Sequence, residues 1–337
     1  MKEPTVIHGI EYAADSALCC GQCGRRFGKS DSLRNLDFCS VKCETEWAEA
    51  NGEHVVKVRG HFPRIGYLDG DGFTFPLNPI GLLKELKPDC MDVFTFLWHP
   101  DRPGIAYDYP HEIENMAVVP VSTFEHWWTA QIDAKTRNMV RKAEKKGVET
   151  AESVLDDELL RGIHEMYNET PVRQGRQFSH YGMTLDVVKE RSSTFPRRSI
   201  YLIAQSKGRI IGFLRMILSE SQTFACIVSI LALIRERDKA PMNALISRAV
   251  KVAAERGISQ LCYGQFTYGQ KGRDTLLDFK LSNGFERLDV PRYYVPLNLR
   301  GEIALRLGLH HGVRERIPES ILAPLRSIRA KWLEDKC

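Results

Sequence analysis

The amino-acid sequence predicts an α/β (α+β) protein in which a mixed β-sheet is flanked by helices. Two observations predict this class. Short apolar or alternating segments, bounded by Gly, Pro and Asp, indicate strands along most of the chain, and segments with helical spacing of apolar residues lie between them. A chain of 337 residues also exceeds one ordinary core and suggests about two domains of roughly 100–200 residues each.

The composition excludes several classes. Hydrophobic residues at 43% and charged residues at 27% are typical of globular proteins and not of disordered or fibrous ones. The formal net charge of +4 neither demands nor excludes nucleic acid. The first twenty residues have no apolar core typical of a secretory signal, and the longest apolar run, 224–234, is shorter than the ~20 residues that span a bilayer. We therefore expect a cytoplasmic protein with no membrane span.

The first 51 residues are expected to form a small zinc module. Cys20 and Cys23 are separated by two residues, fifteen residues follow, and Cys39 and Cys43 are separated by three. Two thiolate pairs at such spacing are typical of a tetrahedral zinc site with four cysteine ligands, with Cys19 as a spare for Cys20. With four protein thiolates no position is left for water, so the zinc is expected to be structural. Free buried thiols are the alternative.

Strands are expected next, within residues 52–121, in the segments HVVKVRG, RIGYLDGDGFTFPL, DVFTFLW and ENMAVVPV. The spacing then becomes helical over 124–149, where Met139, Val140 and Ala143 share one face. Residues 135–147 carry six basic side chains and one acid, Glu144. This cationic helix end is either a nucleic-acid contact or simply a solvated face.

The second half alternates more clearly. SIYLIAQSKGRIIGFLRMILSESQTFACIVSILALI predicts three strands, with a turn through residues 206–208 joining the first two. A helix over 241–257 should begin at Pro241 and end at Gly257, because proline suits the first turn and glycine the end of a helix. SQLCYGQF predicts a strand, DTLLDFKLSNGFER a helix and RYYVPL a last strand. Residues 298–337 predict a helical tail with eight Lys or Arg and five acids.

This order of elements is similar to the GNAT acyltransferase fold. RNMVRKAEKKGVE, IIGFLRM, PMNALISRAVKVAAERG and LDFKLSNGF together resemble the FemAB-like branch of that superfamily, over roughly residues 115–297. The branch includes tRNA-dependent transferases that add amino acids to peptidoglycan precursors, and its members often pack two GNAT-like halves together. The resemblance implies a degenerate first half over 52–150, a GNAT-like acyltransferase domain over 151–297, and the tail over 298–337.

The resemblance implies that a pair of splayed parallel strands holds the acyl donor's carbonyl. In ordinary GNAT enzymes the donor pyrophosphate binds a glycine-rich turn at a helix N-terminus. Here that stretch reads Arg237-Asp-Lys-Ala-Pro-Met242, with alanine and methionine for the glycines and a proline that removes one amide donor. Side chains could still hold a coenzyme A phosphate; the candidates are Arg235, Arg237, Lys239 and Asn243. A solvated basic loop is the alternative.

The branch also carries a lysine in an F-K-x-x-x-G-F segment, matched here by Lys280 between Phe279 and Gly284. Its cation could neutralise an oxyanion or a donor phosphate, unless it snorkels from its helix to solvent. Tyr263 and Tyr268, near the end of the preceding strand, are candidate general acids, and Gln265 is a candidate substrate ligand.

The loop YNETPVRQGRQFSHYG is rich in planar hydrogen-bond donors, which usually bind a ligand or another part of the protein. In a GNAT-like domain this segment lies over the acceptor side. The predicted roles are anion binding by Arg173 and Arg176 with Gln174, close approach at Gly175, and orientation of the amine by His180 or Tyr181. Internal bridges between helices are the alternative.

Three functions are compatible with these features. The first is an N-acyltransferase, for example an N-acetyltransferase, that uses acyl-CoA and acts on a small amine with an anionic group. The second uses aminoacyl-tRNA as donor, favoured by the altered pyrophosphate turn and the basic helices. The third is a nucleic-acid or protein adaptor with an inactive GNAT-like scaffold.

Overall fold

The computed structural model describes residues 56–311 apart from 77, 87–89, 101–103, 105, 174 and 269–274. It also gives the backbone alone of 5–7, 10–12, 43–49, 52–55 and 85. The chain divides into two compact units. Unit 1 combines the chain up to Ile113 with Val290–Gly312, and unit 2 contains Glu114–Asp289. These limits differ from the expected boundaries at residues 150 and 297.

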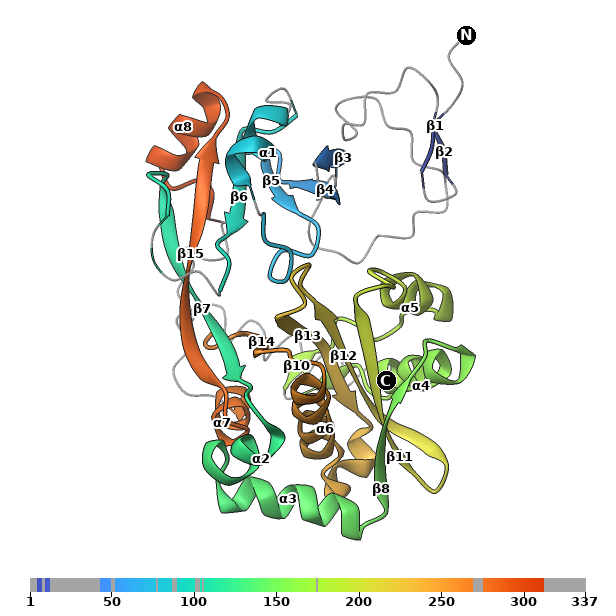
Figure 1. Ribbon diagram of the computed structural model, residues 1–337. Coiled ribbons are helices and arrows are strands. Elements are labelled where there is room, and N and C mark those ends of the chain that lie inside the picture. The colour runs from blue at the N-terminus through green and yellow to red at the C-terminus, as the bar shows by residue number, and fades with distance from the viewer. Residues whose placement is uncertain are drawn as a thin grey trace. The chain divides into compact units, whose positions relative to one another are not determined.

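Unit 1 contains a mixed sheet (Figure 1). Strand β4 pairs antiparallel with β3 and β5, β5 pairs parallel with β6, and β6 pairs antiparallel with the end of β15. The elements of unit 1 are β1 (Thr5–Ile7), β2 (Ile10–Tyr12), β3 (Cys43–Glu49), β4 (Gly52–Arg59), β5 (Ile65–Leu68), α1 (Pro79–Glu85), β6 (Val93–Leu97), the ends of β7 (His111–Pro120) and β15 (Glu286–Pro296) that lie in this unit, and α8 (Leu299–Arg306). Strands β1 and β2 form a separate two-stranded sheet. All five residues of β6 are buried, as is typical of a central strand.

Unit 2 also contains a mixed arrangement of strands, in the order β7-β14-β13-β12-β11-β8. All neighbouring pairs are antiparallel except β13 and β14, which are parallel. The strands are β8 (Val148–Ser153), β11 (Ser199–Ser206), β12 (Arg209–Leu218), β13 (Phe224–Ala232) and β14 (Gln260–Gln265), and the short pair β9 (Val172–Arg173) and β10 (Arg176–Gln177) lies outside this sheet. The predicted hairpin turn is confirmed, with Lys207 and Gly208 both at positive φ, as a tight two-residue turn requires.

Helices flank this sheet (Figure 1). They are α2 (Phe124–His126), the π-helical turn η2 (Trp127–Gln131), α3 (Ala134–Lys145), α4 (Asp157–Asn168), α5 (Leu185–Ser192), the 3-10 helix η3 (Ile234–Lys239), α6 (Pro241–Glu255) and α7 (Thr275–Ser282). The helix predicted over 124–149 is broken before α3, because the Asp133 carboxylate caps α3 by accepting from Thr136 N at 2.7 Å. Helix α6 begins at Pro241 as predicted, and its buried face packs on β11 and β12.

The mixed α/β class is therefore confirmed. Within the described residues, no helix is both long and apolar enough to cross a membrane.

Candidate functional site

The parallel strands β13 and β14 stop pairing partway along their length. Their ladder covers three positions and ends at the pair Cys226 and Cys262. Beyond that pair β13 continues to Ala232 alongside β12, and β14 continues to Gln265 alongside β7. In the described part of the chain, the facing edges of these two strand ends are not hydrogen-bonded to each other, which is the arrangement expected for an acyl-donor slot.

Both strands are also irregular just beyond this point. The β12–β13 register passes from Ile227 to Ser229 and leaves Val228 as a bulge. The β14–β7 register shifts between Cys262 and Gln265, where Gly264 has a φ of +60°. A Cβ at Gly264 would lie 2.7 Å from the Tyr268 hydroxyl, so glycine is required by both the bend and the contact.

The Lys280 side chain lies at this bend. It comes from α7, is 0% exposed, and its ammonium donates a hydrogen bond to the Gln265 carbonyl. Its Nζ is 4.9 Å from the ring centroid of Tyr263 and 4.8 Å from that of Tyr268. Lys280 therefore does not snorkel to solvent; instead its charge is held over two aromatic faces.

The sequence-predicted catalytic residues are thus brought together, and Gln265 joins them through its backbone. Burial, with a smaller effect of Tyr268, raises the pKa of Tyr263 above that of an ordinary tyrosine. Its phenol is therefore protonated at neutral pH. The Tyr268 side chain is 42% exposed.

Two buried thiols at the end of the ladder were missed by the sequence analysis. A hydrogen bond from Cys262 lowers the pKa of Cys226, and the same pairing together with burial raises the pKa of Cys262. Lys280 acts on both in the same direction, favouring a thiolate. Only the strand register places these cysteines side by side, so spacing along the chain gave no signal.

The predicted phosphate loop lies in η3 and at the start of α6. Ala240 adopts a left-handed conformation with φ of 55° and gives α6 no side-chain cap. The Arg235 guanidinium pairs with Glu165, and the Lys239 ammonium lies 2.7 Å from a Glu236 oxygen and 3.1 Å from Ser206 Oγ.

The other two candidate phosphate ligands differ from these. Arg237 is exposed and has no ion pair among the described residues, and Asn243 is half-buried in the first turn of α6. Of the four candidates, two are therefore already held by acids or hydroxyls of the chain.

The loop that follows α4 uses Arg173 internally. Its guanidinium donates to the carbonyls of Met166 and Ala232, at 2.8 and 3.1 Å, and lies 3.0 Å from a Glu169 oxygen. It also covers the Phe178 ring at 4.9 Å. Glu169 in turn accepts from the backbone of η3 at Ile234. These contacts tie the loop to β13 and η3 and occupy the Arg173 guanidinium within the protein.

The remaining loop residues divide by exposure. His180 stacks on Tyr167 with ring centroids 4.4 Å apart, and burial together with the Arg191 charge lowers its pKa. Arg176 and Tyr181 are exposed, and Gly175 has a φ of +69° at the tip of the β9–β10 hairpin. Gln174 lies outside the described residues. The substrate-binding roles of Arg176 and Tyr181 stay predictions.

The predicted zinc ligands Cys20, Cys23 and Cys39 also lie outside the described residues, and of Cys43 only the backbone, in β3, is described. The four-cysteine zinc site stays a prediction.

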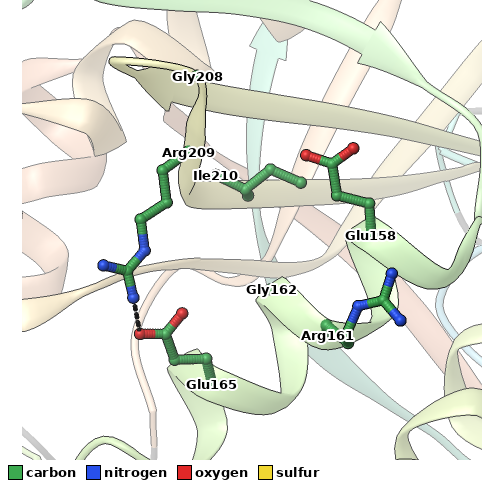
Figure 2. Close-up of a pocket in the computed structure, with 7 residues that line it drawn as sticks. All are labelled: Glu158, Arg161, Gly162, Glu165, Gly208, Arg209 and Ile210. Atoms are coloured by element: carbon green, nitrogen blue, oxygen red, sulfur yellow. Dashed lines mark hydrogen bonds and ion pairs between the residues drawn. The ribbon is translucent and has the colours of Figure 1, made fainter.

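A surface pocket is present between α4 and the β11–β12 turn (Figure 2). Arg209 crosses it to pair with Glu165, and Glu158 and Arg161 line the other side. It does not contain the residues at the end of the β13–β14 ladder, and its charges are of both signs.

The described residues form a mixed α/β protein in which two parallel strands separate at one end. No protein-family model matches the sequence, and no curated protein matches it.

Solved structures give the likeness in detail. FemX superimposes with a TM-score of 0.53 at 11% identity, covering 78% of this chain and 90% of FemX. L-PGS from Bacillus licheniformis gives 0.51 at 14% identity, covering 74% and 83%. The C-terminal domain of a putative lysylphosphatidylglycerol synthetase from Agrobacterium fabrum gives 0.50 at 13%, covering 78% and 87%. At these identities the likeness concerns the fold.

Proposed function

We propose that the chain is an acyltransferase that moves an acyl group to an amine between the separated ends of β13 and β14. The observation that carries the proposal is the buried Lys280 ammonium over Tyr263 and Tyr268, directly where the parallel ladder ends. A buried charge is costly and is seldom kept without a task or a full set of partners.

The chemistry follows from charge. When an amine attacks an acyl carbonyl, negative charge develops on the carbonyl oxygen, and a preorganised cation in a dry site stabilises it. Lys280 would supply that cation. As the bond from the acyl carbon to the leaving oxygen or sulfur breaks, the Tyr263 phenol would pass its proton to that atom, and the resulting phenolate would take up the proton that the amine loses. Exposed Arg176 and Tyr181 would hold the anionic part of the acceptor.

For the donor we favour aminoacyl-tRNA over acyl-CoA, reversing the order expected from the sequence. Pro241 offers no amide at the α6 N-terminus, and Arg235 and Lys239 are engaged with acids, which weakens a pyrophosphate site there. FemX and L-PGS are similar in fold, the FemAB-like branch includes tRNA-dependent enzymes, and the name of the Agrobacterium protein implies transfer of a lysyl group.

A basic helix surface adds to this argument. On α3, Lys135, Arg141, Lys142 and Lys145 are exposed, whereas Lys146, which follows them, pairs with Asp238. Phosphates of a nucleic acid are the natural partners of such a surface. Arg137, also counted as basic from the sequence, instead donates to the Trp128 and Ile132 carbonyls at 2.9 and 2.6 Å.

A melting-temperature screen tests the proposal. The purified protein is heated with acetyl-CoA, with longer acyl-CoA esters and with bulk charged tRNA, each against its deacylated form. Stabilisation that requires the aminoacyl ester is expected, because a ligand that binds only the native state raises its apparent stability.

Stabilisation by a CoA ester alone would restore acyl-CoA as donor. A response to tRNA that is the same with and without the amino acid, with no transfer to any amine, would favour the adaptor with an inactive scaffold.

A further inference from the structure

Two consecutive histidines and a glutamate converge in unit 1. His310 Nε2 lies 3.1 Å and His311 Nε2 lies 2.9 Å from the same oxygen, Oε1 of Glu112. One ligand atom from each of the three residues lies within 4.8 Å of the others. Successive side chains usually diverge, but these two imidazoles lie with centroids 4.0 Å apart.

The backbone explains the convergence. Helix α8 ends at Arg306, and Gly308, with φ of +63°, reverses the chain. Gly308 N bonds to the Leu305 carbonyl and Leu309 N to the Ala304 carbonyl, which closes the helix end tightly. The turn carries both histidines back to Glu112, the second residue of β7.

The surroundings orient the glutamate. The Tyr294 hydroxyl lies 3.4 Å from Glu112 Oε2, the oxygen that the histidines do not contact. The Tyr294 ring also packs on His310 with centroids 4.6 Å apart. In metal sites, a ligating carboxylate is commonly held by a hydrogen bond from a neighbouring side chain. Here Tyr294 contacts one oxygen of Glu112, and the other oxygen faces the two histidines.

We propose that Glu112, His310 and His311 bind a divalent zinc ion. Zinc bonds of ~2.0–2.2 Å at tetrahedral angles place neighbouring ligand atoms ~3.3–3.6 Å apart, so the two contacts between the histidines and Glu112 need to open by ~0.2–0.7 Å. Imidazole and carboxylate together favour zinc or a similar transition metal over magnesium or calcium. Three protein ligands leave one position for water. The bound ion would fasten the turn after α8 to β7.

Cobalt titration tests this site separately from the predicted four-cysteine module. The full chain, without a histidine tag and stripped with chelator, is titrated with Co²⁺ and then Zn²⁺ as competitor. Cobalt on thiolates gives a strong charge-transfer absorption in the near ultraviolet, whereas cobalt on imidazole and carboxylate gives only weak visible bands. The wild type is expected to bind one equivalent that contributes visible bands without added thiolate absorption.

The double variant H310Q/H311Q should lose that equivalent, and E112Q, which keeps the size of the side chain, should weaken it at least tenfold. H126Q removes an exposed histidine on α2 and serves as the matched control. Circular dichroism confirms that each variant is folded. Equal stoichiometry and equal visible spectra for wild type, H126Q, E112Q and H310Q/H311Q would overturn the proposal.

Discussion

At the scale of single residues, a substitution of Lys280 distinguishes a catalytic role of this side chain from a purely structural one. Lys280→Met keeps the length of the stem but removes the charge. We expect kcat/KM for acyl transfer to fall by about 10²–10³-fold, the effect of removing one oxyanion donor. Stability should change by no more than ~1–2 kcal/mol, because an apolar side chain often replaces a buried charge at little cost.

Lys251→Met, on the exposed side of α6, is the matched control and should alter neither quantity. Transfer rates and urea unfolding measure the two effects. A large loss of stability in Lys280→Met with full activity in the folded fraction would mean that the ammonium serves packing alone.

The loop after α4 offers a second pair of residues. Arg173→Ala removes hydrogen bonds to two carbonyls and the partner of Glu169, so we expect the free energy of unfolding to fall by roughly 2–4 kcal/mol. Arg176→Ala, three residues away and exposed, should change it by less than ~0.5 kcal/mol. Urea denaturation of both variants is the measurement. Equal effects would contradict the structural role of Arg173.

Arg173 and Arg176 also show that the role of a side chain does not follow from residue type alone. Arg173 and Arg176 are the same residue in the same loop, and the sequence predicts one role for both. The two arginines differ because only Arg173 donates to the Met166 and Ala232 carbonyls, and Ala232 is 59 residues from Arg173 along the chain. In contrast, Lys280 and the two tyrosines were recognised because they match or closely precede a recurring segment.

At the scale of elements, the bend of β14 is set by Gly264. Gly264→Ala would strain a left-handed backbone, at about 1–2 kcal/mol, and would also push against the Tyr268 hydroxyl. Gly257→Ala, with φ of +68° and nothing within 4 Å of the added Cβ, carries the strain without the contact. We expect similar losses of stability but a decrease in kcat/KM only for Gly264→Ala. Equal kcat/KM values for the two variants would show that acyl transfer does not depend on the position of Tyr268.

A second element-scale prediction concerns pH and the start of β6. Burial would raise the pKa of Asp92, but hydrogen bonds from Arg64 N, the Arg64 guanidinium and Asn298 outweigh it and lower the pKa below 3.8. A lowered pKa in the folded state means stability that is complete above pH ~4 and is lost as pH falls through the folded value.

We therefore expect unfolding free energy to decline in acid, and this decline to be smaller in Asp92→Asn, whose neutral side chain does not titrate there. Urea unfolding between about pH 2.5 and 6 measures it. Parallel pH curves for the two proteins would contradict the assignment.

The elements themselves were predictable where patterns are local. The hairpin at residues 206–208 and the start of α6 at Pro241 follow from turn and helix chemistry. The break before α3, where Asp133 caps the helix, was not predicted, because the residues on both sides of it have helical spacing. The Cys226–Cys262 pair and the bulge at Val228 depend on strand register, which one sequence does not reveal.

At the scale of the whole molecule, the chain does not divide in sequence order. Unit 1 takes residues from both sides of unit 2, because β15 returns to pair with β6. The expected boundaries at 150 and 297 followed the order of motifs, whereas compact units follow long-range pairing. The residues proposed for transfer lie in unit 2, and those proposed for zinc lie in unit 1.

The central claim is that the donor's acyl group lies between the ends of β13 and β14. Photolabelling tests it most directly, with two probes used in parallel: tRNA charged with a diazirine-bearing leucine analogue, and a diazirine-bearing acyl-CoA. After irradiation, labelled peptides are mapped by mass spectrometry, with and without an excess of the unlabelled donor as competitor. We predict label on residues 227–232 and 263–268, stronger from the tRNA probe and displaced by the unlabelled donor. Label confined to unit 1 or to the Glu158–Arg209 pocket, or label unaffected by competitor, would contradict the proposed site.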